Sequence, residues 1–400
     1  MGLGKTYTGA EKMIRLGAEV NLLICQKSKI QDWRNHFAEH YKYDISAYDL
    51  TNKKQWNGFW ENPCGFRYRV GIINYELAWR RKELLKLHEI TLMLDESSLI
   101  QNKTAKQTKF ILKLDAANVI LLSGTPTSGK YENLWTQARL LGWEISESLY
   151  QRQYVNWNTI KIPGGQFVKV VDKANPYKNV DRLKSKLREH GATFLKTEDV
   201  MNLPEQTFIE INISKPKHYD KFMKDSIVTV NGVELVGDTS LTKRLYAREL
   251  CGIYSAEKLE AFRDLISSTN DRIIVFYNFK HELFELNMIA CECDKPVSRI
   301  DGDFKNLGAY EENNNSITFV QYQAGAMGLN LQKANKIIYY SLPERSELFE
   351  QSKKRIHRIG QEKPCFYYLM ICQNTVEVNI YEALKQRKDF TDELFRECEK

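Results

Sequence analysis

Short apolar runs rich in β-branched residues alternate along the chain with longer stretches in which apolar residues recur at helical spacing. In the first third of the sequence, four such runs predict buried strands, each followed by a polar or glycine turn and a helical pattern. This alternation is typical of a parallel sheet with crossover helices. The expected strands are residues 21–26, 70–75, 90–96 and 118–126, and residues 132–143 have helical spacing.

The alternation stops between residues 144 and about 215, where glycine, proline and asparagine are frequent, and restarts after a helical stretch at 241–268. Strands are then expected at 272–279, 316–322, 336–342 and 365–371. We therefore predict an α/β protein with two domains, each a mainly parallel sheet flanked by helices. The expected boundaries are 1–150 for the first domain, 151–230 for a helical connector and insertion, and 231–400 for the second domain.

Composition narrows the class of protein. The 400 residues contain no continuous apolar stretch near the roughly 18 that a membrane helix needs, so no membrane partner is expected. A net charge of +7 permits a polyanionic partner without requiring one. The eight cysteines are scattered with no complete zinc set, which favours reduced thiols in a cytosolic protein.

The chain opens with MGLGKT, which matches the second half of a phosphate-binding loop. Gly2 and Gly4 would let backbone N–H groups approach phosphate oxygens, Lys5 would reach the β and γ phosphates, and the Thr6 hydroxyl would hold Mg²⁺. The full pattern also needs a small residue five positions before Gly4, which lies before residue 1. An ordinary flexible N-terminus is the alternative.

Residues that could take part in nucleotide binding or catalysis follow two further expected strands. Asp95 and Glu96 follow an apolar strand, at the edge where α/β sheets bind ligands; Asp95 could position Mg²⁺ and Glu96 could polarise an attacking water. Ser123 and Thr125 follow the next strand, where hydroxyls could sense a γ-phosphate and couple its state to the rest of the protein. For both segments the alternative is an ordinary solvated turn.

The second half contains a glycine loop and a basic segment. Gly328 lies in the loop AGAMGLNL, before an expected strand. Arg355 and Arg358 are three residues apart in QSKKRIHRIGQ, so we expect them to share a helix face. Two such guanidinium groups suit a phosphoryl group in its transition state, whereas a solvated basic face or a contact to a nucleic-acid backbone is the alternative. We expect His357 to make a polar or packing contact.

Together these segments resemble the Swi/Snf-like family of ATP-driven DNA translocases in helicase superfamily two. The resemblance spans nearly the whole chain, and SGTP combined with HRIGQ is its most specific part. The matching segments, in order, are MGLGKT, LLICQKSKIQDWRNHF, IINYEL, LDESS, LSGTPTSGKYENLW, ATFLKTEDVMNLPEQ, AGAMGLNL and QSKKRIHRIGQ.

The resemblance implies two RecA-like lobes with ATP and Mg²⁺ between them, and movement along double-stranded DNA driven by ATP hydrolysis. One lobe would supply Lys5, Thr6, Asp95 and Glu96, and the other Arg355 and Arg358. DNA contacts would go mainly to phosphates, so binding should depend steeply on salt. The candidate DNA contacts from motif position are Lys27, Ser28, Lys130, Gln323 and Asn330.

Several departures from the family pattern are visible. The acidic motif ends in Ser98 where relatives usually have histidine. The short insertions resemble compact bacterial or phage relatives, which implies the cytoplasm of a bacterial cell or of a phage-infected host. The family's strand before the phosphate loop and its adenine-recognising glutamine motif are both missing. We therefore expect a central strand of the first sheet to be absent, through a late start, a piece supplied by another chain, or decay to a fragment.

The leading hypothesis is a DNA-dependent ATPase that translocates on double-stranded DNA without obligatory strand separation. A helicase acting on RNA or on single strands is the alternative within the same class. A different class is a DNA-binding remnant that does not hydrolyse ATP, or a split subunit that needs an N-terminal partner segment.

Overall fold

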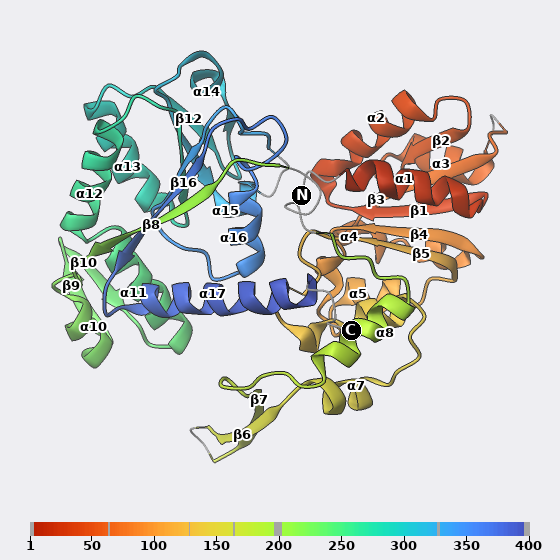
Figure 1. Cartoon of the computed structure of the whole chain (residues 1–400), viewed down its shortest axis with the longest axis horizontal. Coiled ribbons are helices and arrows are strands. Elements are labelled where there is room, and N and C mark those ends of the chain that lie inside the picture. Colours follow the sequence, from red (N-terminus) through yellow and green to blue (C-terminus); the bar gives the residue numbers. More distant parts are fainter. Residues whose placement is uncertain are drawn as a thin grey trace. The chain divides into compact units, whose positions relative to one another are not determined.

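The computed structural model describes residues 4–62, 65–127, 129–162, 165–195, 202–325 and 329–395. The chain divides into two compact units, residues 1–199 with 389–400, and residues 200–388. Each unit is built around a mainly parallel sheet with helices packed on it, which confirms the predicted α/β class (Figure 1). None of the helices in the described ranges is long and apolar enough to cross a membrane.

The first unit contains a five-stranded sheet in which all strands are parallel, in the order β2-β3-β1-β4-β5. All four strands expected in this half are present. The sequence pattern missed β2, a short strand whose residues are mostly half-buried and so lack a long apolar run. The strands are β1 (Val20–Cys25), β2 (Ile45–Asp49), β3 (Tyr68–Asn74), β4 (Ile90–Asp95) and β5 (Ala116–Leu122).

Helices cover both faces of this sheet. Successive strand residues point to opposite sides, and in β1 the residues on both sides are buried, so both faces need a cover. Leu23 of β1 packs in a core cluster with Met13 and Phe37, whereas Leu22 packs in another with Phe59. The helices of this unit are α1 (Lys5–Leu16), α2 (Ile30–His40), α3 (Lys53–Glu61), α4 (Tyr75–Ala78), α5 (Lys106–Ile111), α6 (Trp135–Leu140), α7 (Glu147–Tyr154) and α8 (Val180–Glu189). Short 3₁₀ turns are η1 (Lys27–Lys29), η2 (Lys82–Lys86), η3 (Ser97–Ile100) and η4 (Tyr131–Asn133).

The edges of this sheet bear on the expectation that a strand of the family is absent. Strands β1 to β5 form one continuous sheet. Strand β5 lies at its edge, with no partner on its outer side among the described strands, and most of its residues are only half-buried. The expected absence of a further strand of the family from this sheet stays a prediction.

Residues 151–230, expected to form a connector, contain elements of several kinds. A two-stranded antiparallel ribbon, β6 (Trp157–Lys161) with β7 (Phe167–Val171), extends beyond α7 and α8 (Figure 1). Its base joins a small core of aromatic and leucine side chains that includes Tyr131, Tyr150, Tyr154 and Leu183. Further along, β8 (Gln206–Ile213) joins the sheet of the second unit, where it pairs with β16 (Cys365–Cys372) over its whole length.

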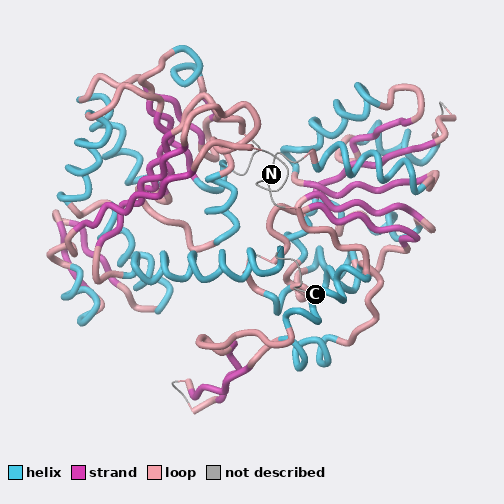
Figure 2. Tube along the Cα trace, in the orientation of Figure 1, coloured by secondary structure: helices cyan, strands magenta, loops and turns pink. Residues whose placement is uncertain are grey.

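The second unit contains a seven-stranded sheet in the order β13-β12-β14-β11-β15-β16-β8 (magenta in Figure 2). Only β13 runs antiparallel to its neighbour. The four strands predicted here are present. The strands are β8 (Gln206–Ile213), β11 (Ile273–Tyr277), β12 (Val297–Ile300), β13 (Lys305–Asn306), β14 (Ile317–Gln321), β15 (Lys336–Tyr339) and β16 (Cys365–Cys372), beside a hairpin of β9 (Ile227–Val230) and β10 (Val233–Val236).

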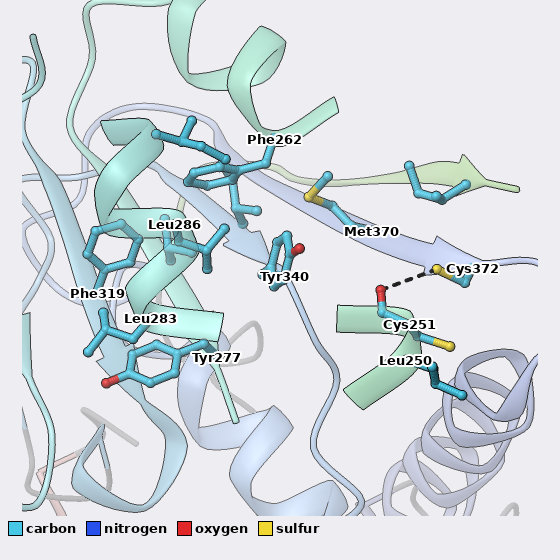
Figure 3. Packing of buried hydrophobic residues seen from close by; sticks show 14 of the residues in the cluster. Leu250, Cys251, Phe262, Tyr277, Leu283, Leu286, Phe319, Tyr340, Met370 and Cys372 are labelled. Atoms are coloured by element: carbon cyan, nitrogen blue, oxygen red, sulfur yellow. Dashed lines mark hydrogen bonds between the residues drawn. The ribbon is translucent and has the colours of Figure 1, made fainter. Parts of the chain in front are cut away.

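One core of this unit brings helices α12 and α13 against the sheet. Figure 3 shows Phe262 and Leu286 from these helices packed with Tyr340 and Met370. The helical stretch expected at 241–268 is two helices, because Ser255 caps the second by accepting a hydrogen bond from the Lys258 N–H. The helices are α10 (Tyr219–Asp225), α11 (Ser240–Gly252), α12 (Ala256–Ser267), α13 (Lys280–Glu292), α14 (Gly308–Glu312), α15 (Tyr322–Gly325), α16 (Ser346–Lys353) and α17 (Val376–Phe395).

Candidate nucleotide and DNA site

The phosphate-loop segment leads directly into helix α1. Gly4 has a φ of 67°, a left-handed conformation that suits glycine, and α1 begins at Lys5. The first turn of α1 contains no acidic residue, so its N–H groups present an unopposed positive end to an anion. Gly2 lies outside the described residues. The structure places Gly4 directly before α1 and Lys5 and Thr6 in its first turn, an arrangement that suits a bound phosphate.

The acidic pair lies at the end of β4. Lys5 Nζ is 3.5 Å from Glu96 Oε1, so the predicted phosphate-binding lysine and the predicted water-polarising carboxylate form an ion pair. Glu96 has a φ of 56°, a left-handed conformation that is strained for a residue other than glycine. Strain of this kind persists where surrounding structure holds a side chain in a functional position.

Asp95 is held by two neighbours that the sequence did not single out for this role. The indole N–H of Trp33 donates to Asp95 Oδ2 at 2.8 Å, and the Tyr75 hydroxyl donates to the Asp95 carbonyl oxygen at 2.9 Å. Burial raises the pKa of Asp95, and the bond from Trp33 lowers that pKa without cancelling the effect of burial. The second carboxylate oxygen receives no protein hydrogen bond that the structure records, which leaves it available to a ligand.

The residues present fit a nucleotide phosphate and a magnesium ion. Lys5 Nζ and Glu96 Oε2 are buried atoms with no hydrogen-bond partner in the described part of the chain. Buried polar atoms without partners are costly and point to a ligand that supplies the missing bonds. A phosphate oxygen suits Lys5, and an oxygen-coordinated divalent cation suits the hydroxyl of Thr6 and the carboxylate of Asp95.

The loop after β5 connects to the acidic loop through glutamine side chains. Gln137 Nε2 donates to the Pro126 carbonyl at 2.7 Å, and Ser97 Oγ donates to Gln137 Oε1 at 3.1 Å. Gln101 Nε2 donates to the same Pro126 carbonyl at 3.0 Å. This chain of bonds joins the residue after Glu96 to the SGTP segment. The sequence pattern gave no signal for Gln137, which lies in the unremarkable helical segment WTQAR.

The two predicted coupling residues lie in this loop. Ser123 Oγ accepts a hydrogen bond from the Thr125 N–H at 3.1 Å, so the serine side chain shapes the turn. Thr125 is buried, and its hydroxyl has no partner among the described residues. A buried hydroxyl without a partner at this position fits a role in sensing a ligand, while Ser123 fits the turn alternative equally well.

In the second unit, Arg355 and Arg358 come together, but not as predicted. Helix α16 ends at Lys353, and both arginines lie in the turns that follow, so the expectation of a shared helix face is wrong. Their guanidinium groups nevertheless converge on one atom, because each donates to the Leu329 carbonyl oxygen at 3.5 Å. Leu329 directly follows the predicted Gly328, which lies outside the described residues.

Arg358 has the environment of an anion-binding group. It donates to Asn330 Oδ1 and forms no ion pair with a carboxylate in the ranges that the structure describes. Burial lowers the pKa of Arg358. A half-buried guanidinium whose side-chain partner is a neutral amide retains an unneutralised charge. His357 Nε2 donates to the Pro204 carbonyl at 2.9 Å, which agrees with the polar contact expected for this side chain.

The candidate DNA contacts are accessible in both units. Lys27 and Ser28 are exposed in η1, and Lys130 is half-buried beside η4, all in the first unit. Gln323 and Asn330 are exposed in the second unit. Their contact with DNA stays a prediction, as do the roles of the nucleotide-binding residues.

Comparison with known proteins agrees with this geometry. Residues 1–253 match the SNF2-related domain, and residues 257–360 match the helicase conserved C-terminal domain. The chain is 24% identical, over 97% of its length, to a mouse SWI/SNF-related matrix-associated actin-dependent regulator of chromatin, subfamily A member 1, and covers 40% of that protein. It is 23% identical, over 99% of its length, to the putative ATP-dependent helicase/translocase YwqA of Bacillus subtilis, and covers 46% of it.

A solved structure is also similar. The SWI2/SNF2 ATPase core of Sulfolobus solfataricus in complex with double-stranded DNA matches with a TM-score of 0.42 and 18% identity, over 98% of this chain and 86% of the other. The chain spans less than half the length of the curated relatives named above. Because the SNF2-related model matches well over half of the chain, and the helicase C-terminal model matches the region after it, this chain belongs to the SNF2-related family of helicase superfamily two.

Proposed function

We propose that this chain hydrolyses ATP and uses the energy to move along double-stranded DNA without obligatory strand separation. The observation that carries the proposal is the arrangement at the start of α1. There Lys5 is paired with Glu96, beside a half-buried Asp95 with one carboxylate oxygen bonded to Trp33. Membership of the SNF2-related family supports the same activity.

In this proposal the residues of the first unit bind the phosphates and prepare a water for attack. Lys5 would leave Glu96 for the β and γ phosphates, helped by the N–H groups of the first turn of α1. Glu96 would then be free to accept a proton from the attacking water. Thr6 and Asp95 would hold Mg²⁺, which neutralises charge on the phosphates.

The second unit would supply cationic groups. We assign Arg358, and with it Arg355, to stabilisation of the negative charge that develops on the transferred phosphoryl group. Ser123 and Thr125 would couple the state of the phosphates to DNA contacts, with Gln137 linking their loop to Ser97. DNA binding would rest on Lys27, Ser28, Lys130, Gln323 and Asn330, and would weaken steeply with salt because phosphate contacts release counterions.

Phosphate release measured with and without duplex DNA tests the activity. The wild-type chain should release phosphate faster with duplex DNA than with single strands or RNA. Lys5→Ala should lower the duplex-stimulated rate by at least about a hundredfold, since it removes a charge that contacts the transferred group. Lys12→Ala, an exposed lysine further along the same helix, is the matched control and should retain the rate.

Displacement of a third strand from a DNA triplex, together with a strand-separation assay, tests movement. A translocase should displace the third strand in an ATP-dependent manner and leave a blunt duplex paired. A folded sample that binds duplex DNA yet releases no phosphate would favour a non-hydrolysing remnant or a split subunit. If RNA or single-stranded DNA, and not duplex DNA, stimulates phosphate release, the chain is instead a helicase that acts on RNA or on single strands.

A further inference from the structure

The ribbon of β6 and β7 presents an unusual surface for a two-stranded element. All five residues of β6 are exposed, and so are Phe167, Val168 and Lys169 of β7. Phe167 alone is 71% exposed. Exposed aromatic side chains on a projecting ribbon are costly in water and indicate a binding surface rather than a structural one.

The strand register separates the side chains onto two different faces. Lys161 is paired with Phe167, Thr159 with Lys169 and Trp157 with Val171, so these six residues share one face. We call it the lysine–aromatic face. The opposite face carries Asn158 and Ile160 across from Val170 and Val168, and has no charged residue. The two faces of a single ribbon therefore differ sharply in chemistry.

The charge of this region suits a polyanion. Residues 157–195 contain eight lysine and arginine residues and three acidic residues, a local net charge of +5 against +7 for the whole chain. Lys161 and Lys169 lie on the lysine–aromatic face and form no ion pair within the described ranges. Lysines placed among aromatic residues, with no carboxylate beside them, favour a phosphate backbone over an ordinary protein surface.

The base of the ribbon is fixed to the segment that follows SGTP. Tyr177, next to the end of the ribbon, stacks on Tyr131 with ring centroids 4.4 Å apart. The Tyr177 hydroxyl donates to Glu132 Oε2 at 2.7 Å and to the Gly129 carbonyl at 3.2 Å. Val155, at the other side of the base, forms a β-bridge with Tyr177. Lys130, a candidate DNA contact, lies within the segment that these bonds hold.

We propose that the lysine–aromatic face is an additional contact surface for double-stranded DNA, with Lys161 and Lys169 on phosphates and Phe167 against the sugar and base edges. The inference rests on the proposed function, since it assumes the same duplex. A two-stranded ribbon fits the major groove, and apolar side chains that reach a groove make close contact with base edges. Through Tyr177 and Glu132 the ribbon would transmit DNA contact to the coupling loop.

Fluorescence anisotropy with a labelled duplex, over a range of salt concentrations, tests whether Lys161 and Lys169 contact phosphates. Lys161→Gln/Lys169→Gln should weaken binding and reduce the slope of log K against log salt by about 1.8, for two lost phosphate contacts. The matched control is Lys53→Gln/Lys54→Gln, two exposed lysines at the start of α3 in the same unit. An unchanged affinity and slope for the ribbon variant, with a normal thermal unfolding curve, would overturn the inference.

Site-specific crosslinking tests whether the duplex contacts the lysine–aromatic face and not the opposite face of the ribbon. A photoreactive benzoylphenylalanine at position 167 should crosslink to the duplex, whereas the same residue at position 168, on the opposite face, should not. Crosslinking of position 167 to a second copy of the chain alone would overturn the proposal in favour of a protein contact. If the wild-type chain binds no duplex at all, the proposed function itself fails. If it binds and both tests are negative, only the ribbon inference fails.

Discussion

At the scale of single residues, Asp95 shows how the site depends on contacts that are distant in sequence. Its carboxylate is bonded by the indole of Trp33, a residue 62 positions away. The sequence predicted Asp95 from its place at a strand end. It could not predict Trp33 as a partner, because that pairing depends on how α2 packs against the sheet.

Trp33→Phe should raise the magnesium concentration needed for half-maximal ATP hydrolysis by about tenfold, a typical cost when a partner of a metal ligand is lost. Phenylalanine keeps the packing against Phe37 but removes the N–H donor. Magnesium titration of the ATPase rate measures the effect. Trp60→Phe, on α3, is the control. Equal magnesium dependence in wild type and Trp33→Phe would show that the indole bond does not position Asp95.

A second residue, Glu282, should make stability depend on pH. It is fully buried, and Oε2 accepts hydrogen bonds from Asn278 N, Phe279 N and Ser341 Oγ at 2.9, 3.0 and 2.8 Å. Burial raises the pKa of Glu282, and these hydrogen bonds lower the pKa without cancelling the effect. Below this raised pKa the folded state holds a proton that the unfolded state has released, so stability increases as pH falls towards the unfolded value.

Urea unfolding of wild type and Glu282→Gln at several pH values isolates this effect. The free energy of unfolding of wild type minus that of the variant should increase as pH falls through the raised pKa, by at most about 1.4 kcal/mol per pH unit. Below the unfolded pKa the difference should become constant. Glu285→Gln, on the same helix, should show no such trend. A difference that is independent of pH would contradict burial as the dominant influence on Glu282.

At the scale of elements, the pattern of apolar residues predicted buried strands better than it predicted the ends of helices and the edge strands of the sheets. Buried runs such as Ile273–Tyr277 are continuous in sequence, so local information is enough to find them. Local sequence information was not enough to predict that helix α16 ends before Arg355. There the chain turns so that Arg355 and Arg358 reach the Leu329 carbonyl and His357 reaches the Pro204 carbonyl, and these partners are remote in sequence.

An ion pair between elements gives a prediction at this scale. Lys258 of α12 donates to both carboxylate oxygens of Glu377 at the start of α17, at 2.7 and 2.8 Å, and both side chains are buried. Burial alone would lower the pKa of Lys258, but the carboxylate of Glu377 outweighs it and raises the pKa. Lys258→Met should reduce the free energy of unfolding by about 3–5 kcal/mol, because it leaves a buried carboxylate without its cation.

Urea unfolding provides the measurement for this pair too. Lys258→Met/Glu377→Gln should recover most of the loss, since the double variant buries no charge. The control is Lys280→Met, whose partner Asp303 lies 3.1 Å away in an exposed pair. Its cost should stay below about 1 kcal/mol. If Lys258→Met costs no more than Lys280→Met, the buried pair does not stabilise the packing of α12 and α17.

At the scale of the whole molecule, the two α/β units were predictable because strands alternate with helices in each of them. The pairing of β16 with β8 could not be predicted in this way. Strand β8 lies 159 residues earlier, in a segment whose glycine and proline content suggested a connector, yet it pairs with β16 along eight residues. Its alternation of exposed and half-buried residues is typical of an edge strand, which a search for continuous apolar runs does not find.

The whole-molecule proposal depends on a cation from the second unit that acts on phosphates bound by the first. Arg358→Ala should lower the rate of hydrolysis in a single turnover by about a thousandfold, as expected for an arginine that stabilises a transferred phosphoryl group. Binding of a fluorescent ATP analogue should fall far less, because most contacts to the bound nucleotide would come from the first unit.

Lys354→Ala is the matched control for this prediction, since it removes a nearby charge from the same segment and has no assigned role. Thermal unfolding curves of the three proteins check that Arg358→Ala remains folded. A variant that loses nucleotide affinity and rate in equal proportion would place Arg358 in ground-state binding. A variant with an unchanged rate would remove Arg358 from the chemistry and leave Arg355 as the candidate cation of the second unit.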